Sequence, residues 1–179
     1  MDDFAIAAET QEQCNATFAQ IGQYLRVPLN QLGIITKFNG VNILQTRWYI
    51  KVSCENYLRK ILESHNWLDL PTFNLPVPML SNLAYQQELE QAIRPTTETE
   101  QQAIQAQAAF IYRMAIEELI YALVVTRLEI SFATTKVSQY SSNPALIHYT
   151  AVKQVFAYLK ETITDGLIFW RPRPATPTI

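Results

Sequence analysis

Apolar residues recur with helical spacing near the start of the chain and predict a helix over residues 11–25. They follow one another at steps of four, three and four positions: Cys14, Phe18, Ile21 and Leu25. This spacing places them on one face of a helix. Thr10 and Gln13 match a capping box, in which both side chains satisfy free amides of the first turn. Pro28 should end the helix, and the apolar run at 4–8 is compatible with a buried strand.

Residues 32–53 show the pattern of strands. Apolar positions lie on both sides of the polar stretch 45–47, so we expect two strands joined as a hairpin. These positions are Val41, Ile43, Leu44, Trp48, Ile50 and Val52. Ser53 offers an N-cap for a following helix over 54–65. The apolar face of that helix consists of Tyr57, Leu58, Ile61 and Leu62.

The middle of the chain interrupts this regular pattern. Prolines rule out a long regular element over 69–84, where the chain has Pro71, Pro76 and Pro78. Residues 85–107 are rich in Gln and Glu. They are compatible with weak surface helices around Pro95, or with a partly ordered linker.

Helical periodicity returns after residue 98 and predicts helices over 98–125, 128–140 and 143–162, with Asn143 and Pro144 as N-cap and first residue of the last. Their inward positions are Phe110, Met114, Leu119, Ile120 and Leu123, then Ile130, Ala133, Val137 and Tyr140, then Ile147, Ala151, Val155, Tyr158 and Leu159. Three amphipathic helices joined by short turns indicate a small bundle.

Composition limits the classes of protein that fit. The chain has 179 residues, of which 49% are hydrophobic and 17% charged, enough for one core or two small ones. It contains no apolar run of about 18 residues and no signal-peptide pattern, so we expect no membrane contact. The net charge is −2, without the basic excess of a free-standing nucleic-acid binder. Any nucleic-acid contact should come from local patches or from other parts of a larger protein.

The two cysteines, Cys14 and Cys54, lie 40 residues apart without a nearby His. This spacing fits neither a zinc site nor a disulfide framework. We expect reduced, buried thiols in an intracellular protein, either cytoplasmic or nuclear.

Five motifs in the second half of the chain point to a family. Residues 112–121 have the sequence YRMAIEELIY, 126–130 TRLEI, 137–144 VSQYSSNP, 148–153 HYTAVK, and 158–162 YLKET before Gly166 and Leu167. In order and spacing they resemble the Y-R-x-x-I-G-x-L-x-Y, T-R-P-D-I, Ser-containing Asn-Pro, H-W/Y-x-A-x-K and Y-L-K-G-T motifs of copia-type retrotransposon reverse transcriptases.

Upstream stretches extend this resemblance over nearly the whole chain. The end of the Y-x-D-D motif resembles Met1-Asp2-Asp3. The L-G and F-L-G-I motifs resemble Leu32-Gly33 and Phe38-Asn39-Gly40-Val41. The start of the thumb resembles Val52-Ser53 together with residues 57–62. The resemblance is weakest at 70–108.

The resemblance implies an α+β fold: palm strands with a hairpin and a helix, followed by a mainly helical thumb bundle. Residues 1–53 would end the palm, with a primer-holding hairpin at 38–52. Residues 54–68 would form the first thumb helix, 69–108 a Pro- and Gln-rich connection and 109–167 the three-helix thumb region. Residues 168–179 would be an extended tail toward an RNase H domain.

The family transfers a nucleotidyl group to a primer 3′-hydroxyl with two Mg²⁺ ions, which prefer carboxylate oxygens. By resemblance, Asp2 and Asp3 would be catalytic metal ligands. Taken without the family, they are more typical of a solvated terminus. A third aspartate and the fingers should lie upstream of Met1, so we expect the chain to be inactive in isolation.

The same resemblance suggests nucleic-acid contacts. Phe38 and Gly40 would meet the primer backbone, although a core Phe and a turn Gly are equally compatible with the pattern. Basic residues that would reach template–primer phosphates are Arg113, Arg127, Lys136, Lys153 and Lys160. The alternative interpretation is that these basic residues belong to an ordinary solvated face of the helices. Binding to an RNA–DNA hybrid should be weak and salt-sensitive, because the net charge is negative.

Other residues have structural interpretations. His148 fits helix packing or capping, and His65 has no visible partner. Four aromatic residues should be core: Tyr121, Phe132, Tyr140 and Phe156. Departures from the family motifs are Asn39, Glu117, Leu128 and Glu161. Glu117 replaces a helix glycine, where a charge should force a shift or a costly burial. We interpret these departures as drift in an element no longer selected for activity.

Three hypotheses follow. The first is a fragment of a retroelement RNA-directed DNA polymerase, with template–primer and the remaining polyprotein (fingers, palm and RNase H) as partners. The second is a non-catalytic helical module, derived from the thumb, that binds proteins or nucleic acid. The third is a full enzyme of which this chain is one part.

Overall fold

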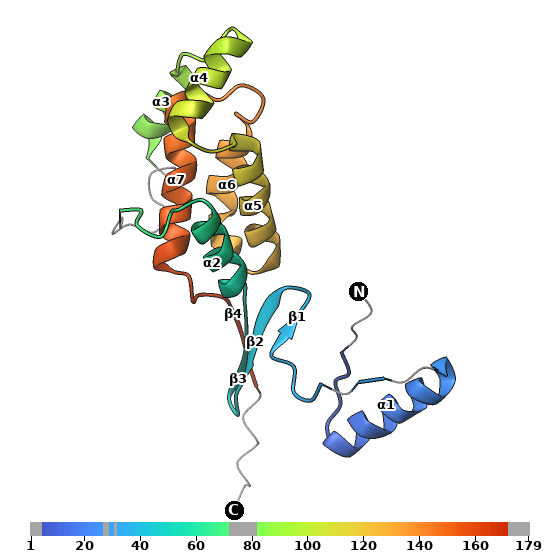
Figure 1. Ribbon diagram of the computed structural model, residues 1–179. Helices are drawn as coiled ribbons and strands as arrows, with labels where there is room; N and C mark the ends of the chain where they lie inside the picture. Colours follow the sequence, from blue (N-terminus) through green and yellow to red (C-terminus); the bar gives the residue numbers. More distant parts are fainter. Residues whose placement is uncertain (1–4, 27–28, 31, 72–81, 172–179) are drawn as a thin grey trace, which may run out of the picture.

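Helices and one antiparallel sheet make up the computed structural model, which describes residues 5–26, 29–30, 32–71 and 82–171 (Figure 1). The elements are α1 (Gln11–Leu25), β1 (Lys37–Phe38), β2 (Val41–Gln45), β3 (Tyr49–Ser53), α2 (Glu55–Ser64), α3 (Leu83–Gln91), α4 (Glu98–Ala108), α5 (Tyr112–Val125), the 3₁₀ helix η2 (Leu128–Ile130), α6 (Ser131–Ser138), α7 (Leu146–Glu161) and β4 (Leu167–Trp170). The expected α+β class is confirmed.

Helix α1 has the predicted bounds and the predicted capping box. The Thr10 hydroxyl accepts from the Gln13 amide, and the Gln13 side chain accepts from the Thr10 amide. No residue of α1 is buried, and the helix stands apart from the other helices in Figure 1. Its apolar stripe is partly covered within the described ranges: Cys14, Phe18 and Ile21 are half-buried, whereas Leu25 is 50% exposed. The strand considered at 4–8 is wrong for residues 5–8, which have no strand partner; residue 4 and Pro28 lie outside the described residues.

The sheet has the order β1-β2-β3-β4, with every neighbouring pair antiparallel. The predicted hairpin is β2–β3, in which Ile43 lies opposite Val52. Asn39 and Gly40 connect β1 to β2 with φ of 47° and 83°. Positive φ at both central residues is what a type I′ hairpin turn requires, and Asn-Gly is its preferred pair. Asn39, interpreted as drift, thus has a local role in this turn.

Strand β4 was not predicted. It pairs with β3 along four residues, from Tyr49 opposite Trp170 to Val52 opposite Leu167. Gly166 makes this approach possible, because a Cβ atom there would lie 2.3 Å from the Val52 carbonyl oxygen. The chain thus returns from the last helix to the sheet that precedes the first bundle helix. Residues 172–179 of the expected tail lie outside the described residues.

Helices α2, α5, α6 and α7 share one hydrophobic core, to which α3 contributes Leu89. The predicted inward positions of α2 hold: Leu58, Ile61 and Leu62 are buried and Tyr57 is half-buried. The helix starts at Glu55, after an N-cap at Cys54 without a side-chain cap, rather than at a Ser53 cap.

The two surface helices considered around Pro95 exist as α3 and α4. The helix predicted over 98–125 is two helices, because Ala109 takes a left-handed conformation with φ of 65°. This break turns Phe110 into the core, against Trp67 and Tyr149. The last helix starts at Leu146 after an N-cap at Ala145, not at Asn143.

Candidate nucleic-acid interface

Two lysines proposed for phosphates, Lys153 and Lys160, bind backbone carbonyls of the chain itself. The Lys153 ammonium donates to the carbonyl of Ala108, the last residue of α4, at 3.0 Å. The Lys160 ammonium donates to the Leu70 carbonyl. Both groups satisfy backbone acceptors and attach neighbouring segments to α7.

Lys136 and Arg113 form ion pairs on the bundle surface. Lys136 pairs with Glu90 of α3 at 2.5 Å, and this hydrogen bond raises the lysine pKa above its usual value. Arg113 pairs with Glu117 one turn along α5 at 3.4 Å, with the arginine side chain 81% exposed. Glu117 is thus solvated, and the costly burial expected for it is wrong. Of the five predicted basic contacts, Arg113 is the one that points most fully to solvent.

Arg127 is enclosed in the fold, with 1% of its surface exposed. Its Nε donates to Glu129 at 2.5 Å, and its two terminal nitrogens donate to the carbonyl and the hydroxyl of Thr162, the C-cap of α7. The guanidinium also lies 5.8 Å from the centre of the Tyr158 ring. Arg127 therefore ties the segment after α5 to the end of α7.

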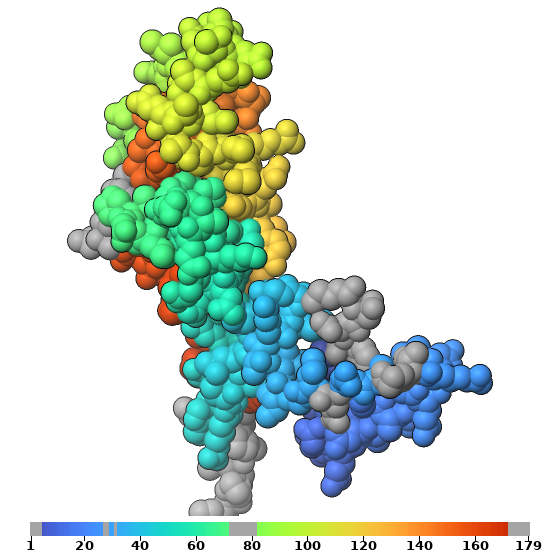
Figure 2. All heavy atoms as spheres, viewed as in Figure 1, coloured from blue at the N-terminus to red at the C-terminus, as the bar shows by residue number. Residues whose placement is uncertain are grey.

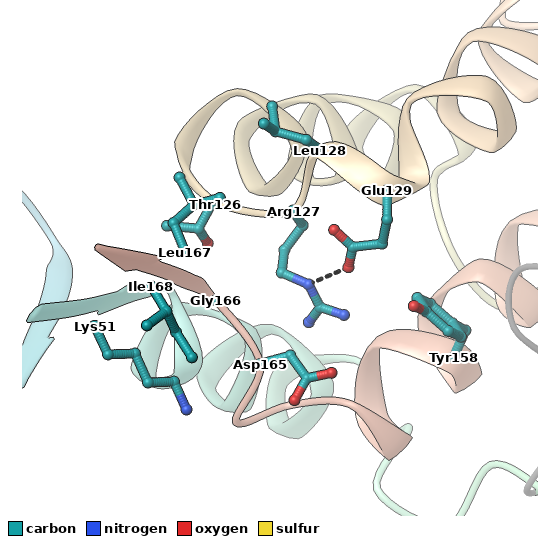
Figure 3. Close-up of a pocket in the computed structure, with 10 residues that line it drawn as sticks. All are labelled: Lys51, Thr126, Arg127, Leu128, Glu129, Tyr158, Asp165, Gly166, Leu167 and Ile168. Atoms are coloured by element: carbon teal, nitrogen blue, oxygen red, sulfur yellow. Dashed lines mark hydrogen bonds and ion pairs between the residues drawn. The ribbon is translucent and has the colours of Figure 1, made fainter. Parts of the chain in front are cut away.

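A cavity of about 350 Å³ opens beside this arginine, between the bundle and the sheet. Figure 3 shows the Arg127–Glu129 pair with Tyr158 and Asp165 on the other side of the guanidinium, and Lys51 entering from strand β3. Two cations and two carboxylates line this space, so its formal charges balance.

The β1–β2 turn meets the bundle at Tyr121. The Tyr121 hydroxyl donates to the Asn39 carbonyl at 3.4 Å. A Cβ atom added at Gly40 would lie 3.1 Å from the Tyr121 hydroxyl oxygen. Phe38 precedes this turn and is half-buried. Phe38 and Gly40 are therefore close together at one turn, whereas four of the predicted cations lie on α5, α6 and α7 and Arg127 lies in the segment after α5.

Both histidines have structural partners. The ring of His148 accepts from the Ala145 amide through Nδ1 at 2.8 Å, and its Nε2 donates to the Leu89 carbonyl at 2.8 Å. This neutral form caps α7 and attaches α3, and burial lowers the pKa of the ring. The predicted packing or capping role of His148 is confirmed. The expectation that His65 has no partner is wrong, because its Nε2 lies 2.8 Å from Glu118.

The aromatic set expected in the core divides into two halves. Tyr140 and Phe156 are buried, whereas Tyr121 is 37% and Phe132 55% exposed. Cys54 is buried and free, as expected, and burial raises the pKa of its thiol.

The predicted metal ligands Asp2 and Asp3 lie outside the described residues. Within the described ranges, no group of three or more His, Cys, Asp or Glu side chains is placed to hold a metal ion. The same ranges contain no helix long and apolar enough to cross a bilayer.

Exposed aromatic rings at the far end of the sheet were missed by the sequence patterns. Trp48 is 57% exposed and Trp170 72% exposed, beside Arg47 and Tyr49. A sequence signal exists: the chain has no Asp or Glu between Glu12 and Glu55, and none after residue 165.

Two known proteins are similar to the chain. The retrovirus-related Pol polyprotein from transposon TNT 1-94 of Nicotiana tabacum is 32% identical over 143 residues, which are 79% of this chain and 10% of that protein. The secreted RxLR effector protein 161 of Plasmopara viticola is 40% identical over 60 residues, which are 34% of this chain and 42% of that protein. No protein-family model and no solved structure matches the chain.

The first of these similarities makes the chain partly homologous to a retrotransposon Pol polyprotein. Of the resemblance described from the five motifs, the relation to a retrotransposon polyprotein is thereby supported. The chain spans about a tenth of the polyprotein and under half of the effector protein.

Proposed function

We propose that the chain forms the primer-holding hairpin and the thumb of a copia-type reverse transcriptase, and thus acts in RNA-directed DNA synthesis. The observation that carries this proposal is the homology over 143 residues to a retrotransposon Pol polyprotein. The motif order from Leu32-Gly33 to Gly166-Leu167 supports the assignment to the polymerase portion of such a polyprotein.

The contact between hairpin and bundle supports this role. The Asn39–Gly40 turn touches Tyr121 of α5, and β3 continues directly into α2. The position of a primer end bound at this turn would therefore depend on the position of the helices. Gly40 lacks a side chain, which lets the Tyr121 hydroxyl lie against the turn, and Phe38 supplies an adjacent ring.

In this proposal Asp2 and Asp3 would bind the metal ions for the polymerisation step. Two adjacent carboxylates fit the oxygen preference of Mg²⁺, which would activate the primer 3′-hydroxyl and stabilise the leaving pyrophosphate. A further aspartate from an upstream palm strand, the fingers and an RNase H domain are the polyprotein partners that the proposal requires.

Fluorescence anisotropy with an RNA–DNA hybrid tests the role of the hairpin. We expect salt-sensitive binding that is tighter for a hybrid with a recessed DNA 3′ end than for a blunt one. Phe38→Ala should remove this preference. Phe132→Ala is the matched control, because Phe132 is an exposed phenylalanine on α6, distant in sequence from the turn.

Equal affinity for recessed and blunt hybrids would contradict the proposal, as would equal losses in the Phe38 and Phe132 variants. Circular dichroism of each variant shows whether the helices remain folded, so that a loss of binding can be assigned to the missing ring.

A further inference from the structure

One face of the sheet gathers cations and aromatic rings without carboxylates on its strands. Tyr49 lies opposite Trp170, and directly opposed side chains share a face. Lys51 is two residues beyond Tyr49 and points to the same side. Lys37 pairs with Asn42, which pairs with Ser53, so the register puts Lys37 on this face too.

The Arg47–Trp48 turn lies at the end of this face. The Arg47 guanidinium lies 5.0 Å from the centre of the Trp48 ring. In Figure 1 and Figure 2 this end of the sheet points away from the bundle. We use the name sheet platform for the six residues of this face and its turn: Lys37, Arg47, Trp48, Tyr49, Lys51 and Trp170.

The platform differs from the rest of the chain in the sign of its charge. The four strands and their turns carry basic residues and no Asp or Glu, although the whole chain has a net charge of −2. The carboxylates next along the chain are Glu55, after β3, and Asp165, before β4, and Asp165 lines the cavity beside Lys51 at the bundle end of the face. The aromatic end of the platform therefore favours a polyanion.

The rings are placed for stacking. Trp170 is 72% exposed, and its ring is held by a T-shaped contact with Tyr49 at 5.4 Å and 69°. An exposed indole held in one orientation offers a flat face to an unpaired base, whereas paired bases hide their faces in a duplex. From Tyr49 to Lys51 the face runs about 7 Å at roughly 3.3 Å per residue, so the ring pair and the lysine lie within reach of one short strand.

We infer that the sheet platform binds single-stranded nucleic acid, with bases stacked on Trp170 and Trp48 and phosphates near Lys37, Arg47 and Lys51. This goes beyond the proposed function, which concerns Phe38 on the opposite face of the sheet. Phe38 pairs with Val41, and Val41 points away from the face that its neighbour Asn42 shares with Lys37. In a polymerase the natural occupant is an unpaired strand of the template.

Binding of a fluorescein-labelled thymidine homopolymer, followed by anisotropy at low and physiological salt, tests the platform. Trp170→Leu keeps an apolar side chain but removes the ring face, and should weaken binding about 5- to 150-fold, as measured for loss of one stacking contact. Tyr24→Ala is the matched control, because Tyr24 on α1 is 88% exposed. Trp170→Tyr should restore part of the affinity.

The cations have their own readout. Lys51→Gln should reduce the slope of log affinity against log salt by about 0.7, the value for one phosphate contact with a single strand. Lys60→Gln on α2, an exposed lysine outside the platform, should leave the slope unchanged. Trp48→Leu in the turn gives a second aromatic test if the β4 variant does not fold.

Several results would overturn the inference: no binding of the homopolymer, a salt slope unchanged by Lys51→Gln, or equal losses in the Trp170 and Tyr24 variants. Self-association that Trp170→Leu abolishes would identify a protein contact instead, and would also overturn it. Binding of the recessed hybrid is measured separately with the Phe38 variant, so failure of the platform and failure of the proposed function remain distinguishable.

Discussion

Replacement of Arg127 by methionine should unfold the helical bundle far more easily than the same change at Arg113. Arg127→Met retains much of the apolar stem but removes the guanidinium that holds Glu129 and both oxygen groups of Thr162. Loss of one partner from a buried pair costs about 3–5 kcal/mol. Glu129 is 41% exposed and can regain water, so we expect the lower end, about 3 kcal/mol.

Urea unfolding followed by circular dichroism measures this difference. With a slope of about 2 kcal/mol per molar urea, a loss of about 3 kcal/mol lowers the midpoint by about 1.5 M. Arg113→Met should shift stability by no more than about 0.5 kcal/mol, because that side chain is 81% exposed. Arg127→Lys should fall between the two, since an ammonium cannot form the same forked contacts.

Equal midpoints for Arg127→Met and Arg113→Met would refute the reasoning, because a phosphate-binding arginine contributes nothing to folding in the absence of nucleic acid. The comparison therefore separates the structural role of Arg127 from the nucleic-acid role first predicted for it.

Three further changes test individual contacts by the same unfolding assay. Gly166→Ala should cost about 1–3 kcal/mol, because its Cβ would overlap the β3 backbone, whereas Gly22→Ala in α1 should not destabilise. Wild-type stability should fall as pH drops below about 6.5, since burial lowers the folded pKa of His148 and the unfolded chain then binds more protons; His148→Gln should flatten this dependence. Tyr112→Phe should cost about 1 kcal/mol by losing a buried 2.7 Å bond to an α6 carbonyl, and Tyr24→Phe almost nothing. A pH dependence unchanged in the His148 variant, or equal effects within either matched pair, would contradict these contacts.

Local signals in the sequence predicted local structure well. The bounds of α1 follow from its capping box, and the buried face of α2 follows from its apolar spacing. The β4 strand has no such signal, since a four-residue apolar run does not specify its partner. The break at Ala109 was missed for a related reason: the packing of Phe110 into the core outweighs the helical preference of the flanking residues.

The basic residues show what a sequence does not reveal about a site. Arg127 looks like a candidate phosphate contact until the position of Thr162, 35 residues later in the chain, is known. Lys153 likewise reaches a carbonyl 45 residues away. Long side chains find such partners only through tertiary packing. The motifs that indicate the family thus contain residues that hold the bundle together.

Photocrosslinking of a primer terminus tests the central proposal most directly. A DNA primer with a photoreactive 3′-terminal nucleotide is annealed to an RNA template, bound to the protein and irradiated, and the crosslinked peptide is identified by mass spectrometry. The same probe at the primer 5′ end is the control. We predict that the 3′ probe labels residues 38–41, at the β1–β2 turn, and that the 5′ probe does not. Labelling of α1, or the same labelling from both primer ends, would contradict a primer-holding role for this hairpin.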